Sequence, residues 1–395
     1  MLDNIATRLS RYPLLKRVMK FLYQVVSYIL NFHLQKKNCL FPVERVSARM
    51  GGFFGYYDKS PESPDGKYLV YHALSNDDTR VTVVLKNISD GSEKIIAVTK
   101  AFNLQAGSRL HWLSNNSFIF NMYHELPDDY YSVIYDVTSG LQKKNVAALY
   151  DTHNQNYLSI NFKNLAYCGS EYGYYAHKKT DNVIPVINAG NFKDDTIRPL
   201  VEYETVKRLV PAVSESANKV HFNHVMYNPA GTAFVFIVRW NGASGRQDAL
   251  LHYALNTGVT KVINQEMTSH FCWLNDETLF GYMCHESRKG YYELFIPDRK
   301  FTLCDNKELA GDGHPTYKNG IVLTDTYPDK ARMQHVMILN DHKALLVGRF
   351  FSPLTFNETN RCDLHPRFNT TGKKIYIDSK HEGTRHLYCI KFIQP

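Results

Sequence analysis

"SRLHWLSNNSFIF" (residues 108–120) and "SHFCWLNDETLFG" (residues 269–281) match almost position by position. Trp112 aligns with Trp273, and Arg109 aligns with His270. Each stretch places an aromatic residue before a short polar turn and continues into an apolar run. Aromatic and β-branched residues on both sides of a turn are typical of paired β-strands. The two stretches therefore indicate two copies of one β unit.

Further copies of this unit follow the same plan. "HVMYNPAGTAFVFI", "HPTYKNGIVL" and "HPRFNTTGKKIYI" each place a histidine three residues before an aromatic residue. Two weaker copies are "LSINFKNLAYCG" and "DKSPESPDGKYLVYH", the second without the aromatic residue. We call the position three residues before the aromatic residue, or its equivalent in the copy without one, the anchor of each copy. The seven anchors are Ser60, Arg109, about Ser159, His224, His270, His314 and His365.

The spacing of the anchors predicts the fold. They are separated by 49, 50, 65, 46, 44 and 51 residues. Periods of about 40 to 50 residues filled with short strands are typical of β-propeller blades of four strands each. The sequence therefore predicts an all-β, seven-bladed β-propeller over residues 41–395. The last blade is expected to close against an early strand within "FPVERVSA" (residues 41–48), which would leave no open sheet edge.

Composition is consistent with a large β domain that has an acidic partner. Hydrophobic residues make up 44% of the 395 residues, and aromatic residues make up 13%. The net charge of +8 suggests an acidic polysaccharide, nucleic acid or a membrane surface as partner. Because no basic block and no nucleic-acid signature accompany the charge, we expect no nucleic-acid partner. Seven cysteines at irregular spacings argue against a disulfide framework and for a reducing compartment.

Residues 1–40 form a separate amphipathic segment in this interpretation. The apolar run "VMKFLYQVVSYILNF" (residues 18–32) contains Lys20 and Gln24 and is too short to span a bilayer. Its apolar positions fit one helix face, and basic residues precede it. Such a helix could pack on the propeller, bind peripherally to a membrane surface, or act as an atypical export signal. A bacterial-type cytoplasm or the membrane periphery is the expected location, with export as an alternative.

Propeller geometry gathers polar residues on one face of the predicted disc. The start of the first strand and the end of the second strand of a blade lie on the same face. The anchors mark the first-strand starts. The residues at the predicted second-strand ends are His72, His124, Tyr172, Arg239, Cys284, His285, Tyr327 and His381.

Three anchors suggest a metal site. His270, His314 and His365 occupy equivalent positions in three successive blades, so their imidazoles could meet one divalent cation: zinc, manganese or calcium. Cys272 or Cys284 could complete a tetrahedral zinc set. Alternatively, each histidine forms hydrogen bonds to the next blade as a structural repeat residue.

A second group suggests acid–base chemistry on a sugar. His221, Asn223 and His224 start one strand, and Arg239 ends the next. Imidazole and phenol groups can transfer protons, and Arg239 could bind a substrate carboxylate in bidentate fashion. Tyr282 in the next blade could accept or donate the proton. Alternatively, Arg239 forms a salt bridge between blades and Tyr282 packs.

A hydrolase is a third interpretation. No GxSxG motif supports a serine hydrolase. The acidic residues Asp312, Asp325, Asp329 and Asp363 would be the candidates for a two-carboxylate glycosidase. They are also typical of turns and strand ends.

Several short motifs resemble one enzyme family. "GYYDKSPESPDGKYLVYH", "HFNHVMYNP", "GDGHPTY", "TDTYPD" and "CDLHPRFN" together resemble the propeller-fold polysaccharide lyases, the oligogalacturonate and ulvan lyase group. The resemblance implies β-elimination on a uronic-acid-containing, acidic polysaccharide, for example a capsular one. It implies Arg239 as the group that neutralises the uronate, His224 or His124 as the base, and Tyr282 as the acid. Further candidates for substrate contacts are Tyr172, Asn223, His285 and Arg367.

The sequence therefore predicts a polysaccharide lyase. The alternative is a non-catalytic propeller that binds a glycan or scaffolds a complex. A divalent metal could be structural or catalytic in the lyase.

Overall fold

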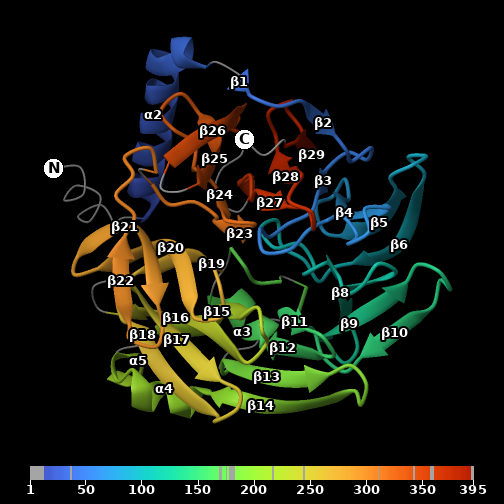
Figure 1. The fold of residues 1–395 in the computed structure, drawn as a ribbon, viewed down its shortest axis with the longest axis vertical. Coiled ribbons are helices and arrows are strands. Elements are labelled where there is room, and N and C mark those ends of the chain that lie inside the picture. Colours follow the sequence, from blue (N-terminus) through green and yellow to red (C-terminus); the bar gives the residue numbers. More distant parts are fainter. Residues whose placement is uncertain are drawn as a thin grey trace.

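The computed structural model describes residues 13–35, 38–168, 171–174, 176–177, 183–215, 218–242, 245–309, 311–340, 343–355 and 360–392. Seven antiparallel sheets follow one another around a ring in chain order (Figure 1). The predicted seven-bladed β-propeller is thus confirmed.

Blades 1 to 3 come from the first half of the chain. Blade 1 consists of β3 (Gly52–Phe53), β4 (Tyr68–Leu74), β5 (Val81–Asn87) and β6 (Glu93–Thr99). Blade 2 consists of β7 (His111–Trp112), β8 (Ser117–His124), β9 (Asp129–Asp136) and β10 (Gln142–Asn145). Blade 3 consists of β11 (Asp151–His153), β12 (Asn156–Ile160), β13 (Val186–Asn191) and β14 (Thr196–Glu202).

Blades 4 to 7 complete the ring. Blade 4 consists of β15 (Asn218–Tyr227), β16 (Ala233–Gly242), β17 (Gly245–Ala254) and β18 (Val259–Asn264). Blade 5 consists of β19 (Thr268–Trp273), β20 (Thr278–His285), β21 (Arg288–Phe295) and β22 (Lys300–Leu303). Blade 6 consists of β23 (Thr316–Lys318), β24 (Ile321–Asp325), β25 (Met333–Asn340) and β26 (Lys343–Phe351), with β1 (Asn38–Cys39) added at its edge.

Blade 7 closes the ring with a strand from the start of the domain. It consists of β27 (Arg367–Phe368), β28 (Lys374–Ser379), β29 (His386–Lys391) and β2 (Val43–Arg45). The β2 strand pairs antiparallel with β29 and lies within residues 41–48, where the closing strand was predicted. This closure covers the edge that β29 would otherwise expose.

The third anchor was placed wrongly by the sequence pattern. Ser159 lies in β12, the second strand of blade 3, whereas the inner strand β11 begins at Asp151. The error arose because blade 3 carries an insertion, the helix α3 (Phe162–Cys168), and is followed by α4 (Tyr203–Leu209) and α5 (Ala212–Glu215). These helices lengthen the interval before His224 and weaken the period.

The hydrophobic core lies between neighbouring blades. In β16, Phe234 and Phe236 pack toward the cluster shared with blade 3, while Val235 and Ile237 pack toward the cluster shared with blade 5. Successive strand residues point to opposite faces, so a strand covered on both faces is continuously apolar. Full burial of each large apolar side chain contributes about 1.5 to 3 kcal/mol.

Residues 54–61, which we call the central segment, explain why the first anchor is not a histidine. The inner strand of blade 1 stops after Phe53, and pairing with β4 resumes only at the isolated bridge between Glu62 and Leu69. Between these points the chain crosses the central channel and contacts five other blades. Its hydrogen-bonding partners are Asp378 and His365 of blade 7, His224 of blade 4, Phe271 of blade 5, Arg109 of blade 2 and Asp151 of blade 3.

A glycine allows this crossing. Gly55 has a φ of +121°, and a Cβ at this position would lie 2.7 Å from the carbonyl carbon of Ala106. L side chains rarely adopt this conformation, so glycine permits both the turn and the close approach.

The predicted N-terminal helix is present. The helix α2 (Pro13–Asn31) and the short 3₁₀ helix η1 (Phe32–Leu34) run along the outer side of blade 6 (Figure 1). The Tyr28 ring lies 6.1 Å from the Phe351 ring. No helix in the described part of the chain is both long and apolar enough to cross a bilayer. The division at residue 40 stays a prediction, although β1 on its N-terminal side already belongs to the sheet of blade 6.

Candidate functional site

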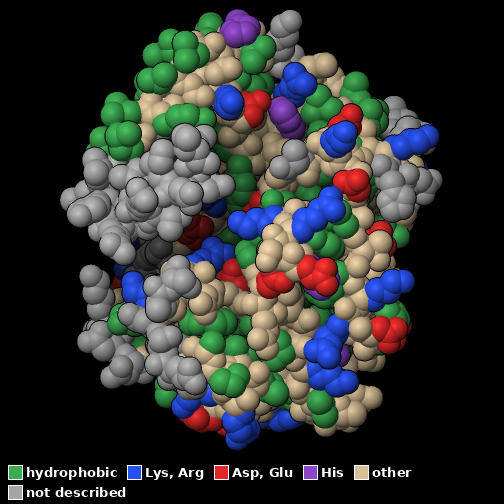
Figure 2. Space-filling model, turned by 90° about the vertical axis from the view of Figure 1, so that its left-hand side faces the viewer, with side chains coloured by type: hydrophobic (Ala, Val, Ile, Leu, Met, Phe, Trp, Pro, Cys, Tyr) green, Lys and Arg blue, Asp and Glu red, His purple; other side chains and the backbone are tan. Residues whose placement is uncertain are grey.

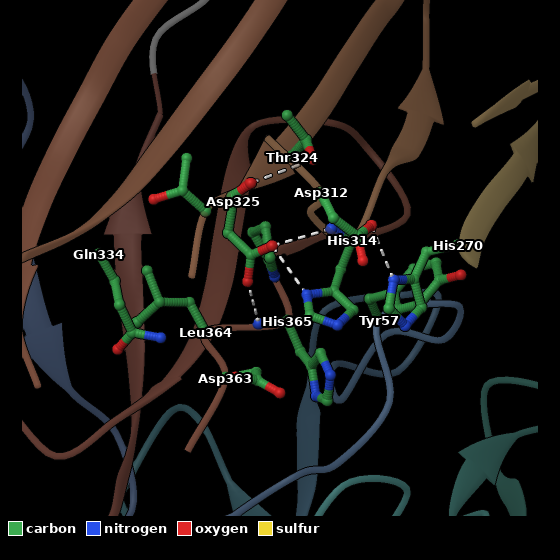
Figure 3. Close-up of polar contacts among 12 residues, drawn as sticks. Tyr57, His270, Asp312, His314, Thr324, Asp325, Gln334, Asp363, Leu364 and His365 are labelled. Carbon is green, nitrogen blue, oxygen red and sulfur yellow. Dashed lines mark hydrogen bonds and ion pairs between the residues drawn. The ribbon is translucent and has the colours of Figure 1, made fainter. Parts of the chain in front are cut away.

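Four imidazoles from four successive blades meet at the centre of the ring. They belong to the anchors His224, His270, His314 and His365, and all four are buried. Ring centroids are 5.4 Å apart for His224 and His270, 4.2 Å for His270 and His314, and 4.3 Å for His314 and His365. Figure 3 shows His270, His314 and His365 together with Tyr57 of the central segment. The predicted convergence of the histidine anchors is therefore observed.

Three anchors share an unusual backbone conformation. The φ values are +55° at Arg109, +51° at His224 and +44° at His365. A left-handed conformation at a residue other than glycine costs about 1 to 3 kcal/mol and is concentrated at functional sites. The shared conformation indicates that these three anchors are structurally equivalent.

His314 and His365 each present a nitrogen atom that lacks a partner. The Nδ1–H of His314 donates to Asp325 Oδ1 at 2.8 Å, and the Nδ1–H of His365 donates to the Gly55 carbonyl at 2.9 Å. The Nε2 atoms of both rings are buried and have no hydrogen-bond partner among the described residues. One ligand atom of each ring and a carboxylate oxygen of Asp363 lie within 4.8 Å of one another.

These three residues fit a divalent metal ion. Metal-bound histidines usually donate their other ring N–H to a carboxylate or carbonyl, as both rings do here. A set of two imidazoles and one carboxylate suits zinc or manganese, whereas calcium prefers oxygen ligands. Burial opposes charge on His314, but the facing Asp325 outweighs this and raises the pKa of the ring. Burial also raises the pKa of Asp363, against the effect of Arg361.

The sequence contains a local signal for this cluster. Aspartate stands two residues before histidine in both "DGH" (residues 312–314) and "DLH" (residues 363–365). In the first motif, a Cβ at Gly313 would lie 1.9 Å from the Asp325 carbonyl oxygen. Glycine therefore lets the chain approach the end of β24, where Asp325 accepts both the backbone N–H and the ring N–H of His314.

His270 lies beside this cluster but has different partners. Its Nδ1 lies 3.2 Å from Asp312 Oδ1, and its Nε2 lies 3.3 Å from the Tyr172 hydroxyl. Ser269 also donates to Asp312, at 2.6 Å. Burial, aided by the neighbouring His314, lowers the pKa of His270 to about 4. The ring is therefore neutral near pH 7, with Nδ1–H directed at the carboxylate and Nε2 unprotonated.

His224 belongs to a chain of hydrogen bonds that ends at the central segment. Asp248 accepts from Arg239 Nε at 2.9 Å, and Arg239 donates from a terminal nitrogen to His224 Nε2 at 3.0 Å. Since the guanidinium can only donate, neutral His224 carries its proton on Nδ1 and donates it to the Tyr56 hydroxyl oxygen. Burial, followed by the neighbouring Tyr57, raises the pKa of Tyr56 well above its usual range. Tyr56 is thus a neutral phenol whose own proton remains available for donation.

Arg239 forms a buried ion pair with Asp248 inside blade 4, whereas the alternative predicted a salt bridge between blades. It is 4% exposed and also donates to the carbonyls of Thr268 and Ser269. These contacts occupy the guanidinium nitrogens of Arg239 inside the protein. We therefore interpret Arg239 as a residue that positions His224.

Arg361 borders the cluster, a position that the sequence analysis missed. Its Nε donates to both oxygens of Asp363, at 2.9 and 2.8 Å, and its guanidinium lies 5.1 Å from the centre of the Tyr327 ring. The Arg361 side chain is 23% exposed, and its far end lies 3.7 Å from Glu171, which is 47% exposed. Arg361 is therefore a cation that solvent reaches and that touches the metal cluster.

Two predicted residues lie at the ends of second strands, but their rings pack away from the site. His124 is hydrogen-bonded to Lys144 and stacked on Tyr131 in blade 2. His285 is stacked on Phe301 at 4.0 Å in blade 5. The rule that second-strand ends reach the central face failed here because both imidazoles turn toward the third and fourth strands of their own blades.

Other predicted residues are near the site but turned to structural partners. His221 contacts the Lys219 carbonyl at 3.0 Å. Asn223 accepts from the Tyr150 hydroxyl at 2.7 Å. Arg367 is buried and donates to the His365 carbonyl and to Asp378, which in turn accepts from the central segment.

Of the remaining candidates, one lies within the site and three lie outside it. Tyr172 is within it, with its ring 5.1 Å from the His224 ring. Tyr282 is one strand further out and packs on Tyr291. Cys284 donates to Glu266 at 2.9 Å, and Cys272 lines a separate pocket of about 280 Å³ at the opposite mouth of the channel. Neither cysteine belongs to the metal cluster found among the described residues.

Comparison with known proteins supports the fold. No protein-family model matches the sequence, and no curated protein does. An oligogalacturonate lyase solved in complex with manganese matches with a TM-score of 0.63 at 11% identity, over 91% of this chain and 96% of that one. Oligogalacturonate lyase from Vibrio parahaemolyticus matches with a TM-score of 0.61 at 10% identity, over 90% of this chain and 96% of that one. At this identity the likeness shows a shared propeller fold.

Proposed function

We propose that this protein is a metal-assisted polysaccharide lyase that cleaves a uronate-containing, acidic polysaccharide by β-elimination. One observation carries the proposal: two buried, unpartnered imidazole nitrogens and a carboxylate lie beside an unprotonated imidazole and a neutral phenol. A scaffold or a simple glycan-binding protein has no need for this combination. The fold shared with oligogalacturonate lyases is consistent with it.

His314, His365 and Asp363 would hold the metal ion, zinc or manganese by their chemistry. A divalent ion supplies Lewis acidity, which withdraws charge from a bound uronate carboxylate and acidifies the neighbouring carbon. Arg361 binds and orients the same carboxylate through its solvent-facing nitrogens. It takes the role that the resemblance implied for Arg239, because Arg239 is buried in its ion pair.

Proton transfer is assigned to two groups that approach from different blades. His270 Nε2 accepts the proton from the carbon next to the carboxylate, while Asp312 holds the ring in the required tautomer. The electron pair forms the new carbon–carbon double bond as the glycosidic carbon–oxygen bond breaks. Tyr56 donates its proton to the departing oxygen, and His224 Nδ1–H stabilises the phenolate that forms. The polysaccharide therefore yields an unsaturated uronyl end and a free hydroxyl.

The test uses a panel of acidic polysaccharides: polygalacturonate, alginate, hyaluronan and bacterial capsular preparations. We expect a rise in ultraviolet absorbance from the unsaturated uronyl product with at least one of them. The rise should disappear in His365→Gln and persist in His285→Gln, the matched control at the end of the second strand of blade 5. Cleavage without the chromophore would contradict the proposal in favour of hydrolysis, and binding without cleavage would favour a glycan-binding propeller.

A further inference from the structure

The helix α2 and η1 present an apolar surface to solvent. Figure 2 faces this side of the molecule and shows hydrophobic side chains gathered over its upper part. Ten large apolar side chains of this stretch are between 46% and 68% exposed. We call this set the apolar face: Val18, Met19, Phe21, Leu22, Tyr23, Val26, Ile29, Leu30, Phe32 and Leu34.

The helix packs on the propeller through its more polar side. Ser27 is the one buried residue among the described side chains of α2, and Asn31 donates to its carbonyl at 2.7 Å. Gln35, just beyond η1, donates to the Ala331 carbonyl at 3.0 Å. This arrangement is the reverse of an ordinary surface helix, whose apolar side faces the core.

The spacing makes the apolar face continuous. Positions 18, 22, 26 and 30 follow one another at intervals of four residues, and position 29 lies three residues after 26, so they form one stripe along the helix. Contiguous exposed apolar surface of this kind marks a site of interaction with a protein or a membrane.

The charge of this stretch favours a membrane over a second copy of the protein as the partner of the apolar face. From residue 4 to residue 43 the sequence contains no Asp or Glu, but it contains seven basic residues: Arg8, Arg11, Lys16, Arg17, Lys20, Lys36 and Lys37. Two copies joined through this surface would bring like charges together. An anionic bilayer attracts them instead, with about 1 kcal/mol for each basic residue near the surface.

We propose that α2 and η1 dock the protein on the surface of an anionic lipid bilayer. The apolar face enters the boundary between headgroups and acyl chains, with the helix lying in the plane of the membrane. Tyr23, Phe21 and Phe32 provide the aromatic residues that favour this interface. This inference is independent of the proposed lyase activity, because none of its residues lies in the candidate site.

The test is co-sedimentation of the full chain with vesicles of phosphatidylcholine alone and of equal parts phosphatidylcholine and phosphatidylglycerol. We expect binding to the anionic vesicles, weakened by added salt. The double variant Leu22→Asp, Ile29→Asp should reduce the partition coefficient at least about tenfold for each side chain. Both positions are exposed, so the midpoint of urea unfolding should stay unchanged.

The matched control is Ile95→Asp, Val98→Asp, which changes two half-exposed apolar residues on β6, the outer strand of blade 1. It should bind vesicles like the unchanged protein. Failure of the unchanged protein to bind anionic vesicles would overturn the proposal. A dimer that forms without lipid and is lost in Leu22→Asp, Ile29→Asp would also overturn it, in favour of self-association.

Discussion

Blades 4 to 7 and blades 1 to 3 use the same strand positions for different purposes. The anchors of blades 4 to 7 are histidines whose rings meet at the centre. On the opposite half, Arg109 holds Asp58 with nitrogen–oxygen distances of 2.7 and 3.3 Å, and Asp151 holds Lys59 at 2.5 Å. These ion pairs fix the central segment, which carries Tyr56 and Tyr57 toward the histidines. One half of the ring thus supplies reactive groups, and the other half positions their partners.

Buried histidines in the two halves differ in how their nitrogens are used. His72 contacts the Phe54 carbonyl and Ser108, and His111 contacts the Arg109 carbonyl and Thr152, so both nitrogens of each ring have partners. In His314 and His365 only Nδ1 does. Burial alone therefore does not mark a functional histidine. The feature that distinguishes the proposed metal ligands is a buried ring nitrogen that nothing in the described protein satisfies.

Removing a proposed metal ligand should have the largest effect. His314→Gln or His365→Gln is expected to abolish bound metal and to lower kcat by at least about 10³-fold, since metal and electrostatic stabilisation contribute this much. Elemental analysis and the uronyl absorbance assay measure the two effects. His124→Gln, at the end of the second strand of blade 2, is the control. Equal losses of metal and kcat in this variant would contradict the assignment of the reactive groups to blades 4 to 7.

Removing Arg109 should destabilise the fold next most strongly. Arg109→Ala leaves Asp58 buried without its partner, and breaking a buried pair in this way costs about 3 to 5 kcal/mol. The free energy of unfolding from urea titration tests this. Arg288→Ala breaks an exposed pair with Asp305 and should change it by less than about 1 kcal/mol. Similar values for the two variants would show that the central segment does not depend on the pair.

Substitutions of the two tyrosines of the central segment should have different effects, one on catalysis and the other on stability. Tyr56→Phe removes the proposed acid and is expected to lower kcat by about 10²-fold or more with little change in KM. Tyr57 donates to the Phe271 carbonyl at 3.1 Å, so Tyr57→Phe should cost only about 1 kcal/mol of stability. Steady-state kinetics and urea unfolding of both variants make the comparison. A larger kcat loss in Tyr57→Phe would reverse the assignment.

Acidification should weaken the fold through the structural histidines. Burial lowers the pKa of His72 from 6.5 to about 4 and that of His111 to about 3. Between these values and 6.5 the unfolded chain binds more protons, so stability falls as the pH is lowered, by up to about 1.4 kcal/mol per pH unit for each ring. The urea midpoint measured from pH 7 to pH 4 tests this. His72→Asn should show a shallower decline, and an unchanged slope would remove His72 from the account.

The repeat made the fold predictable because each blade carries the same strand–turn–strand chemistry. Ring closure then follows, and it brings His270, His314 and His365 together although they lie far apart in the sequence. The central segment could not be predicted, because its departure from the inner strand depends on contacts with five other blades. For the same reason Tyr56 was missed. Arg361 was missed because it lies before the repeated unit that starts at His365, between β26 and β27. Rim residues such as His285 were predicted as site residues because strand-end position does not reveal distance from the ring axis.

Anomalous X-ray diffraction from crystals grown with manganese or zinc would test the central claim most directly. We predict one strong anomalous peak within coordination distance of His314 Nε2, His365 Nε2 and a carboxylate oxygen of Asp363. A fully occupied ion elsewhere, with these two nitrogens still unliganded, would contradict the assignment of this half of the ring as the reactive one.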